Sequence, residues 1–138
     1  MNIKLILKNV FALVFLVGLV SCGKKPINGD LDGRWQLMTI DYHENGDIDK
    51  PEFTYYDVGL HVMKLWKTTG EDGSFGPSWL GRFSHEGDSL HIRMIRMNKK
   101  MVQPFGLNDT IQHFCVETLK KKKMVLNSDY ARLEFRKF

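Results

Sequence analysis

The chain of 138 residues lacks most of the features that mark enzymes, metal proteins and disulfide-rich secreted domains. It contains only two cysteines, Cys22 and Cys115, and its five histidines are scattered along the sequence. There is no Gly-x-Ser-x-Gly turn, no His-Glu-x-x-His pair and no glycine-rich phosphate loop ahead of a helix. We therefore expect no catalytic residues, no cofactor and no metal site.

A strong excess of one charge sign is also missing. The chain carries 20 Lys and Arg residues against 16 Asp and Glu residues. Lys4 and Lys8 belong to the N-terminal segment described next, and without them the balance is 18 to 16. Such a small excess argues against a nucleic-acid partner. The basic run Lys120–Lys123 predicts a solvated hairpin turn, and contact with an acidic membrane surface is the alternative.

A long hydrophobic run occurs once, at the N-terminus. The uncharged stretch 10–20 follows Lys4 and Lys8, and it is shorter than the roughly 20 apolar residues of a membrane span. This pattern is typical of a signal peptide. The next residues, Leu19-Val20-Ser21-Cys22, are similar to a bacterial lipobox. In a lipobox the cysteine receives fatty acyl chains such as palmitate, and the chain is cleaved just before it, so that the cysteine becomes the N-terminus. An ordinary signal peptide with an incidental Cys22 is the alternative.

These features predict three parts: a signal peptide at 1–21, a lipid-anchored tether at 22–32 and a folded domain at 33–138. Glycine, proline and turn-forming residues dominate the tether. We expect a protein of the cell envelope that is anchored through Cys22 to the outer membrane. We expect it to face the periplasm, because Gly23-Lys24-Lys25 lacks the acidic residues that, in some bacteria, follow the acylated cysteine of lipoproteins exported to the cell surface. Exposure at the cell surface is the alternative. Cys115 then has no partner for a disulfide, and we expect it to pack as a small apolar group.

Short alternating segments separated by turn signals fill the predicted domain, and no long amphipathic helix is evident. We expect strands at 33–41, 54–67, 78–85, 89–97, 110–119, 124–126 and 130–137. In the first strand, the pattern places Trp35, Leu37 and Thr39 on one face. The pattern of segment 54–67 predicts one long strand, with Gly59 at a bulge or bend.

Strands at hairpin spacing leave almost no room for crossover helices, which excludes a parallel α/β sheet. We therefore predict an all-β fold, an antiparallel up-and-down β-barrel of about seven to eight strands, because closure removes exposed sheet edges. A small β-sandwich is the alternative.

The first strand begins with Gly33-Arg34-Trp35, which resembles the Gly-x-Trp signature of lipocalins. Together with the lipobox, the short tether and the final hairpin, it makes the chain similar to the small lipocalin-like lipoproteins of Gram-negative bacteria, which have a calycin-type β-barrel. The resemblance implies that Trp35 closes one end of the barrel. It also implies that a cation, Arg132 or Arg136, lies across the indole ring.

Two functions remain open. The first is non-catalytic binding of a small apolar or amphipathic ligand inside the barrel. The second is a protein-interaction module, such as an envelope inhibitor or accessory subunit, with a filled barrel. An apolar internal void would favour the ligand, and a packed interior with an exposed apolar patch would favour the partner. The residues predicted to line the ligand site are Tyr56, Leu60, Val62, Leu90, Ile92 and Phe114.

Histidines on the predicted strands provide a test of the metal prediction. His61, His91 and His113 would converge if all three pointed into the barrel. Their spacing matches no common metal motif, so we expect structural or surface roles for them.

Overall fold

The computed structural model describes residues 2–17, 27–69 and 74–138. An N-terminal helix, α1 (Ile3–Val17), lies within the predicted signal peptide. Within the described ranges, no helix is both long enough and apolar enough to cross a membrane. Cys22 and the predicted cleavage site lie outside the described residues. The lipid anchor and the predicted division into parts therefore stay predictions.

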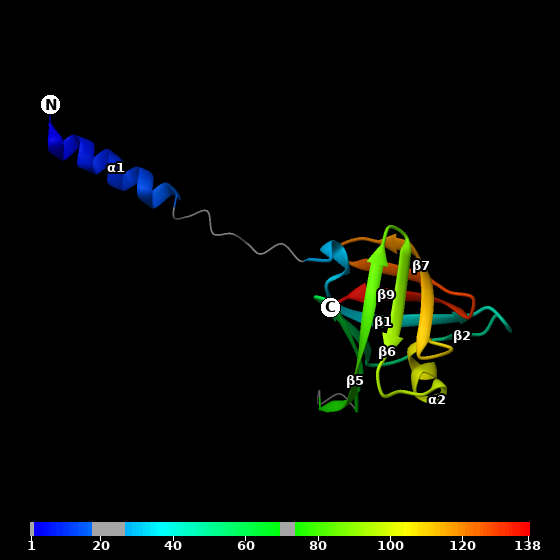
Figure 1. Cartoon of the computed structure of the whole chain (residues 1–138). Coiled ribbons are helices and arrows are strands. Elements are labelled where there is room, and N and C mark those ends of the chain that lie inside the picture. Colours follow the sequence, from blue (N-terminus) through cyan, green and yellow to red (C-terminus); the bar gives the residue numbers. More distant parts are fainter. Residues whose placement is uncertain (1, 18–26, 70–73) are drawn as a thin grey trace.

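Eight antiparallel strands close into one barrel (Figure 1). Each strand pairs with the next along the chain, and β1 pairs with β9 to complete the ring. A ninth strand, β2 (Ile48–Asp49), is a short flap on β1. This arrangement confirms the predicted up-and-down barrel and not the sandwich. The barrel strands are β1 (Gly33–Tyr42), β3 (Thr54–Gly59), β4 (Val62–Thr68), β5 (Phe75–Glu86), β6 (Ser89–Met94), β7 (Ile111–Leu119), β8 (Lys123–Asn127) and β9 (Ala131–Lys137).

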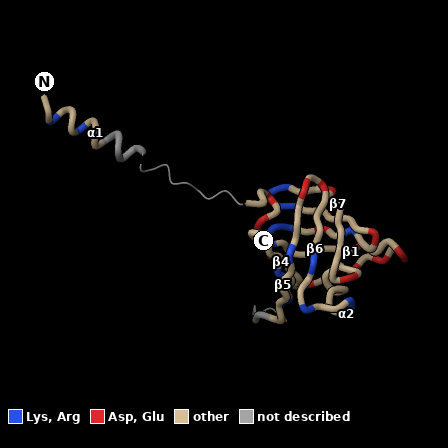
Figure 2. The backbone as a smooth tube through the Cα atoms, in the orientation of Figure 1, with Lys and Arg blue, Asp and Glu red and all other residues tan. Residues whose placement is uncertain are grey.

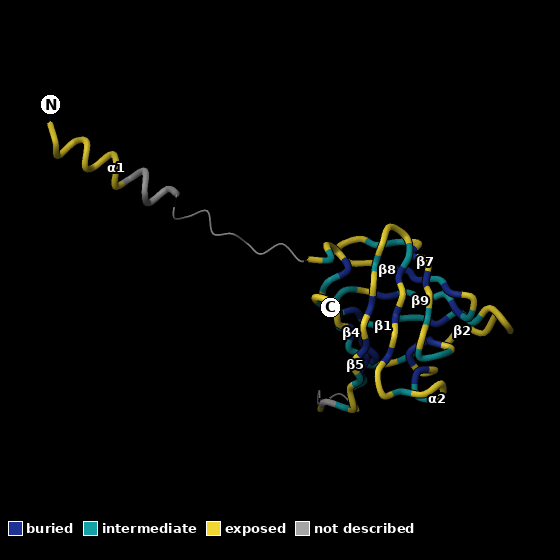
Figure 3. Tube along the Cα trace, viewed as in Figure 1, coloured by how far each residue is buried: buried dark blue, intermediate teal, exposed yellow. Residues whose placement is uncertain are grey.

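Strand β6 shows how alternation builds the core. Leu90, Ile92 and Met94 point inward and are buried, whereas His91 and Arg93 between them are exposed. Figure 3 shows the same alternation of buried and exposed residues along the other strands. Because neighbouring side chains of a strand point to opposite faces, one apolar set from every strand fills the centre.

A bulge in β1 changes which residues face the core. The pairing of β1 with β9 shifts register between Leu37 and Thr39. Such a bulge adds one residue to a strand and reverses the alternation beyond it. Trp35, Leu37 and Ile40 are therefore fully buried, and Thr39 is not. The prediction that Thr39 shares a face with Trp35 and Leu37, and that Ile40 lies on the other face, is wrong for this reason.

The predicted long strand 54–67 is a hairpin. Strands β3 and β4 pair with each other, with Gly59 opposite Val62 and a two-residue turn at Leu60 and His61. Leu60 has a φ of +55°, a backbone conformation usually filled by glycine or asparagine in such turns. The turn was missed because neither turn residue is a turn former, although a strand of that length would have been unusual.

One end of the barrel is closed by a helical segment in the connection between β6 and β7. It consists of α2 (Lys99–Val102) and η2 (Gln103–Phe105), and the Asn98 side chain caps α2 by accepting a hydrogen bond from the Met101 amide, 3.0 Å away. Its apolar side chains enter the barrel mouth and are buried. They are Val102, Phe105 and Leu107.

The opposite end is closed by residues predicted to be tether. The short helix η1 (Gly29–Leu31) crosses this end, and Leu31 is fully buried. The Trp35 indole N–H donates to the Leu31 carbonyl at 2.8 Å. The Asn28 side-chain amide donates to the Leu60 carbonyl, also at 2.8 Å. Residues 28–31 of the predicted tether therefore pack onto this end of the barrel.

A buried hydrogen bond joins the helical segment to the barrel wall and yields a stability prediction. The Tyr56 hydroxyl is completely buried and donates to the Phe105 carbonyl. Tyr56→Phe would leave that carbonyl without its donor, so we expect a loss of about 1–2 kcal/mol in the free energy of unfolding, measured with urea. Tyr130→Phe, at a half-buried surface position, should change it by less than about 0.5 kcal/mol. Equal effects of the two substitutions would contradict this account.

Candidate functional site

The barrel interior, where the ligand was predicted to bind, is filled by the protein's own side chains. The Tyr56 ring lies 4.8 Å from the Phe135 ring and 6.4 Å from the Phe105 ring, centroid to centroid. A water-sized void beside a side chain would leave it a surface that water could touch. The following inward side chains have none: Trp35, Leu37, Tyr56, Met63, Leu65, Leu90, Phe114, Met124, Leu126 and Leu133.

The residues predicted to line a ligand site fall on both sides of the barrel wall. Tyr56, Leu90, Ile92 and Phe114 belong to the buried core. Leu60 and Val62 instead lie outside, with 63% and 41% of their surface exposed. The β3–β4 turn is the reason, because it restarts the alternation and makes Met63 the first inward residue of β4. The interior placement of Leu60 and Val62 is therefore wrong.

The cation over Trp35 is a lysine. The Lys137 ammonium lies 4.9 Å from the centroid of the Trp35 ring and donates to the Asp30 carbonyl at 2.9 Å. Lys137 pairs with Trp35 in the β1–β9 ladder, which brings its long side chain to the closed end of the barrel. Neither Arg132 nor Arg136 takes the position that the resemblance implied.

Both arginines are engaged on the outer wall instead. Arg132 forms ion pairs with Glu117 at 3.1 Å and with Glu134 at 2.7 Å. Arg136 donates to the side-chain oxygen of Gln36 at 2.8 Å. These two positions of β9 share the outward face with Glu134, so their side chains point away from the Trp35 ring.

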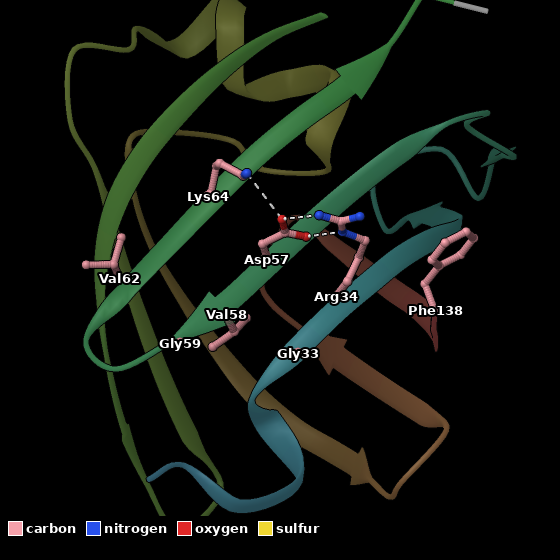
Figure 4. Close-up of a pocket in the computed structure, with 8 residues that line it drawn as sticks. All are labelled: Gly33, Arg34, Asp57, Val58, Gly59, Val62, Lys64 and Phe138. Carbon is pink, nitrogen blue, oxygen red and sulfur yellow. Dashed lines mark hydrogen bonds and ion pairs between the residues drawn. The ribbon is translucent and has the colours of Figure 1, made fainter. Parts of the chain in front are cut away.

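A hollow of about 520 Å³ lies on the outer wall across β1, β3 and β4 (Figure 4). Asp57 lies at its centre and binds Arg34 through two hydrogen bonds, of 3.0 and 3.1 Å. The Lys64 ammonium approaches the same carboxylate to 3.3 Å. The residues that line this β1–β3–β4 hollow are Gly33, Arg34, Asp57, Val58, Gly59, Val62, Lys64 and Phe138.

An aromatic pair beside the hollow holds its charged groups in place. Tyr55 and Trp66 point outward but are buried, because their rings stack at 4.6 Å. The Arg34 guanidinium lies 4.7 Å from the centroid of the Trp66 ring, and the Lys64 ammonium lies 5.5 Å from it. Phe138 packs its ring edge-on against Tyr55 at 5.7 Å. Aromatic faces on an outer wall thus immobilise two cations.

The charge state of Asp57 follows from its neighbours. Burial raises the pKa of Asp57, but hydrogen bonds from Arg34, Trp66 and Lys64 outweigh burial and hold this pKa below its ordinary value. The hydrogen bond to Asp57 raises the pKa of Arg34. Near neutral pH the hollow therefore holds two cations and one carboxylate. This excess of positive charge beside apolar Val62 suits a partner group that is itself both acidic and apolar.

The histidines of the predicted strands and Cys115 do not form a shared site among the described residues. His91 and His113 stack at 4.3 Å on the outer wall, and His61 lies in the β3–β4 turn. Among the residues that the structure describes, no group of three or more His, Cys, Asp or Glu side chains is placed to hold a metal ion. Cys115 is exposed, so the prediction that it packs as a small apolar group is wrong.

A second hollow, of about 420 Å³, lies at the end of the barrel that carries β2. Tyr42 and Tyr130 form its wall, with their rings edge to face at 5.5 Å. Acidic loop residues, Glu44, Asp47 and Asp49, complete it. This hollow lacks the fixed cations of the first, so we take the β1–β3–β4 hollow as the candidate functional site.

Comparison with known proteins agrees with this architecture. Residues 16–138 match a family described as a lipocalin-like domain. The chain belongs to this lipocalin-like family. A lipocalin-like protein from Bacteroides uniformis superposes with a TM-score of 0.66 and 26% identity, covering 80% of this lipocalin-like chain and 100% of that chain. An uncharacterized protein from Bacteroides eggerthii gives 0.65 and 22%, covering 78% and 98%. No curated protein matches.

Membership confirms the resemblance drawn from Gly33-Arg34-Trp35. Lipocalin-like proteins are generally not enzymes. Barrels of eight strands are either just filled by side chains or hold one small ligand, so the lipocalin-like fold by itself is compatible with binding a small molecule, whereas the inward side chains described above fill this barrel. The hollow on the outer wall was not predicted from the sequence. The alternation of Arg34, Asp57 and Lys64 with apolar neighbours was the available signal, but it required the β3–β4 pairing to be interpreted.

The ion pairs of Asp57 predict a pH-dependent loss of stability. Because the pKa of Asp57 is lower in the folded state than in the unfolded chain, its carboxylate stabilises the fold above the ordinary aspartate pKa of about 3.9 and loses this effect as the pH falls through the lowered value. We expect Asp57→Asn to cost about 1 kcal/mol at pH 7. The difference from wild type should shrink in acid. Asp88→Asn, in an exposed turn, should show little effect in urea titrations at either pH.

The contact of Lys137 with Trp35 predicts which cation matters. Lys137→Gln should lower the free energy of unfolding by about 0.5–1 kcal/mol, because the indole loses its cation. Arg136→Gln removes an exposed outer-wall contact and should cost less. Thermal unfolding of both variants measures the difference. A larger loss of unfolding free energy for Arg136→Gln than for Lys137→Gln would favour Arg136 as the cation over the Trp35 ring, as the sequence resemblance implied.

Proposed function

We propose that this lipocalin-like chain is a non-catalytic, lipid-anchored protein of the cell envelope that binds a protein partner through the β1–β3–β4 hollow. The filled interior carries this proposal, because side chains such as Tyr56, Leu90 and Phe114 leave no space for a ligand beside them. The lipobox at Cys22 supports the anchor. The outer membrane facing the periplasm is the membrane we favour, with the cell surface as the alternative.

The composition of the hollow favours a protein over a small molecule. Residues that dominate the energetics of protein interfaces are enriched in tryptophan, tyrosine and arginine. Of these residue types Arg34 lines the hollow, and the buried Tyr55–Trp66 pair already holds its guanidinium in place, so ordering Arg34 on binding costs little. Val62 and Phe138 add exposed apolar surface at the rim. A partner side chain with a carboxylate beside an apolar group would satisfy both features.

Site-specific photo-cross-linking in cells tests this proposal. A photoreactive amino acid at Val62, in the hollow, should capture one protein partner, and the same group at Ile111, exposed on β7, should not. Lys64→Glu should abolish capture at Val62, because it reverses the charge that faces the partner. Equal capture at both positions, or capture that survives Lys64→Glu, would contradict a specific interface.

The competing function is tested on the same purified protein. A small apolar fluorescent probe, N-phenyl-1-naphthylamine, should show no saturable binding, because the interior has no room for it. Saturable binding that a fatty acid displaces, and that Lys64→Glu does not change, would move the site from the outer wall to the barrel interior.

A further inference from the structure

Three segments meet at the end of the barrel where the chain enters it. Helix η1 crosses this end, and the Asn28 side chain binds the Leu60 carbonyl in the β3–β4 turn. On its other side the Lys137 ammonium binds the Asp30 carbonyl, and the Lys137 amide binds the Lys122 carbonyl in the β7–β8 turn. We call this surface the tether end: residues 27–31, Leu60 and Lys120–Lys122.

Two large apolar side chains are exposed at the tether end. Ile27 and Leu60 have 67% and 63% of their surface exposed. Leu60 also has a φ of +55°, which is unfavourable for any residue with a Cβ and would suit glycine. An exposed leucine in a strained turn position contributes nothing to the core. Strain of this kind at a surface residue points to a binding role.

Lysines border the same end. Lys120, Lys121 and Lys122 are exposed, and within the described part of the chain no carboxylate lies within ion-pair distance of them. Figure 2 shows basic segments close to where the chain enters the domain. The tether end also carries Asp30. The β5–β6 turn, with Glu86 and Asp88, lies at this same end of the barrel but on the side of the strand ring opposite β1.

The predicted anchor limits how far this end can lie from a membrane. Four residues lie between Cys22 and Ile27, and the five residue steps from one to the other span at most about 18 Å when the chain is fully extended. The headgroup layer itself is about 6 Å thick. Ile27 and the turns beside it are therefore kept within one or two Debye lengths of the lipid surface, a distance at which their charged side chains still interact with charged headgroups.

We propose that the tether end docks on an anionic phospholipid surface, with Ile27 and Leu60 inserted among the headgroups and Lys120–Lys122 facing the lipid phosphates. This inference rests on the lipid anchor of the proposed function. It goes further by giving the barrel one orientation on the membrane. The β2 end then points away from the bilayer. The β1–β3–β4 hollow faces sideways and begins next to the membrane surface, because Gly59 and Val62, which line it, flank the turn that carries Leu60.

Fluorescence of the acylated protein in vesicles tests the docking. An environment-sensitive NBD label is placed at His61→Cys, beside Leu60, or at Glu44→Cys near β2, each with Cys115→Ser. In vesicles of phosphatidylcholine mixed with phosphatidylglycerol, the label at position 61 should become brighter and blue-shifted. The label at position 44 should stay in water. In phosphatidylcholine alone, the change at position 61 should be much smaller.

Matched variants separate docking from folding. Lys121→Gln with Lys122→Gln should lower the ratio of docked to undocked protein by about tenfold or more, since each lysine near an anionic surface is worth about fivefold. Lys99→Gln with Lys100→Gln, at the other end of the barrel, should leave this ratio unchanged. Leu60→Gly should weaken docking without lowering thermal stability, because glycine accepts the backbone conformation of the turn.

Flotation of the vesicles distinguishes the two proposals. If the protein floats with the vesicles but the label at position 61 is neither brighter nor more blue-shifted than the label at position 44, docking is wrong and the anchor stands. Equal effects of the two lysine pairs would also overturn docking. If the protein does not float, the anchor fails and the docking inference fails with it.

Discussion

The pairing of β1 with β9 is the contact on which the rest of this barrel depends. It joins the first and last strands and leaves no free edge along the ring. It also places Lys137 over Trp35, which brings η1 down onto the end of the barrel through Leu31 and Asp30. Without this pairing the inward side chains would line an open sheet, and neither end would be closed.

A filled interior moves the question of function to the outer wall. In a barrel of eight strands the choice between a packed centre and a ligand cavity depends on the size of the inward side chains. Here Tyr56 and Phe114 occupy the centre, and Phe105 closes the mouth. The Phe105 carbonyl accepts a hydrogen bond from the Tyr56 hydroxyl. The outer wall instead combines fixed charges with exposed apolar groups, as around Asp57. Both proposals concern this outside surface.

Local patterns were enough to predict much of this fold. The alternation of Leu90, Ile92 and Met94 and the spacing of the turn signals indicated antiparallel strands, because the two faces of a strand meet different surroundings. The Gly33-Arg34-Trp35 start of β1 indicated the lipocalin-like family. These features are properties of short segments, so they can be read before any pairing is known.

The sequence by itself thus determined the class of fold, most of the strand-forming segments and several inward residues, among them Tyr56, Leu90 and Phe114. Only the tertiary structure decided the bulge that turned Ile40 inward, the hairpin that put Leu60 outside, and the choice of Lys137 over the nearby arginines. Each of these depends on register between strands far apart in the chain. A shift of one residue reverses the face of every side chain beyond it, and no local pattern specifies that shift.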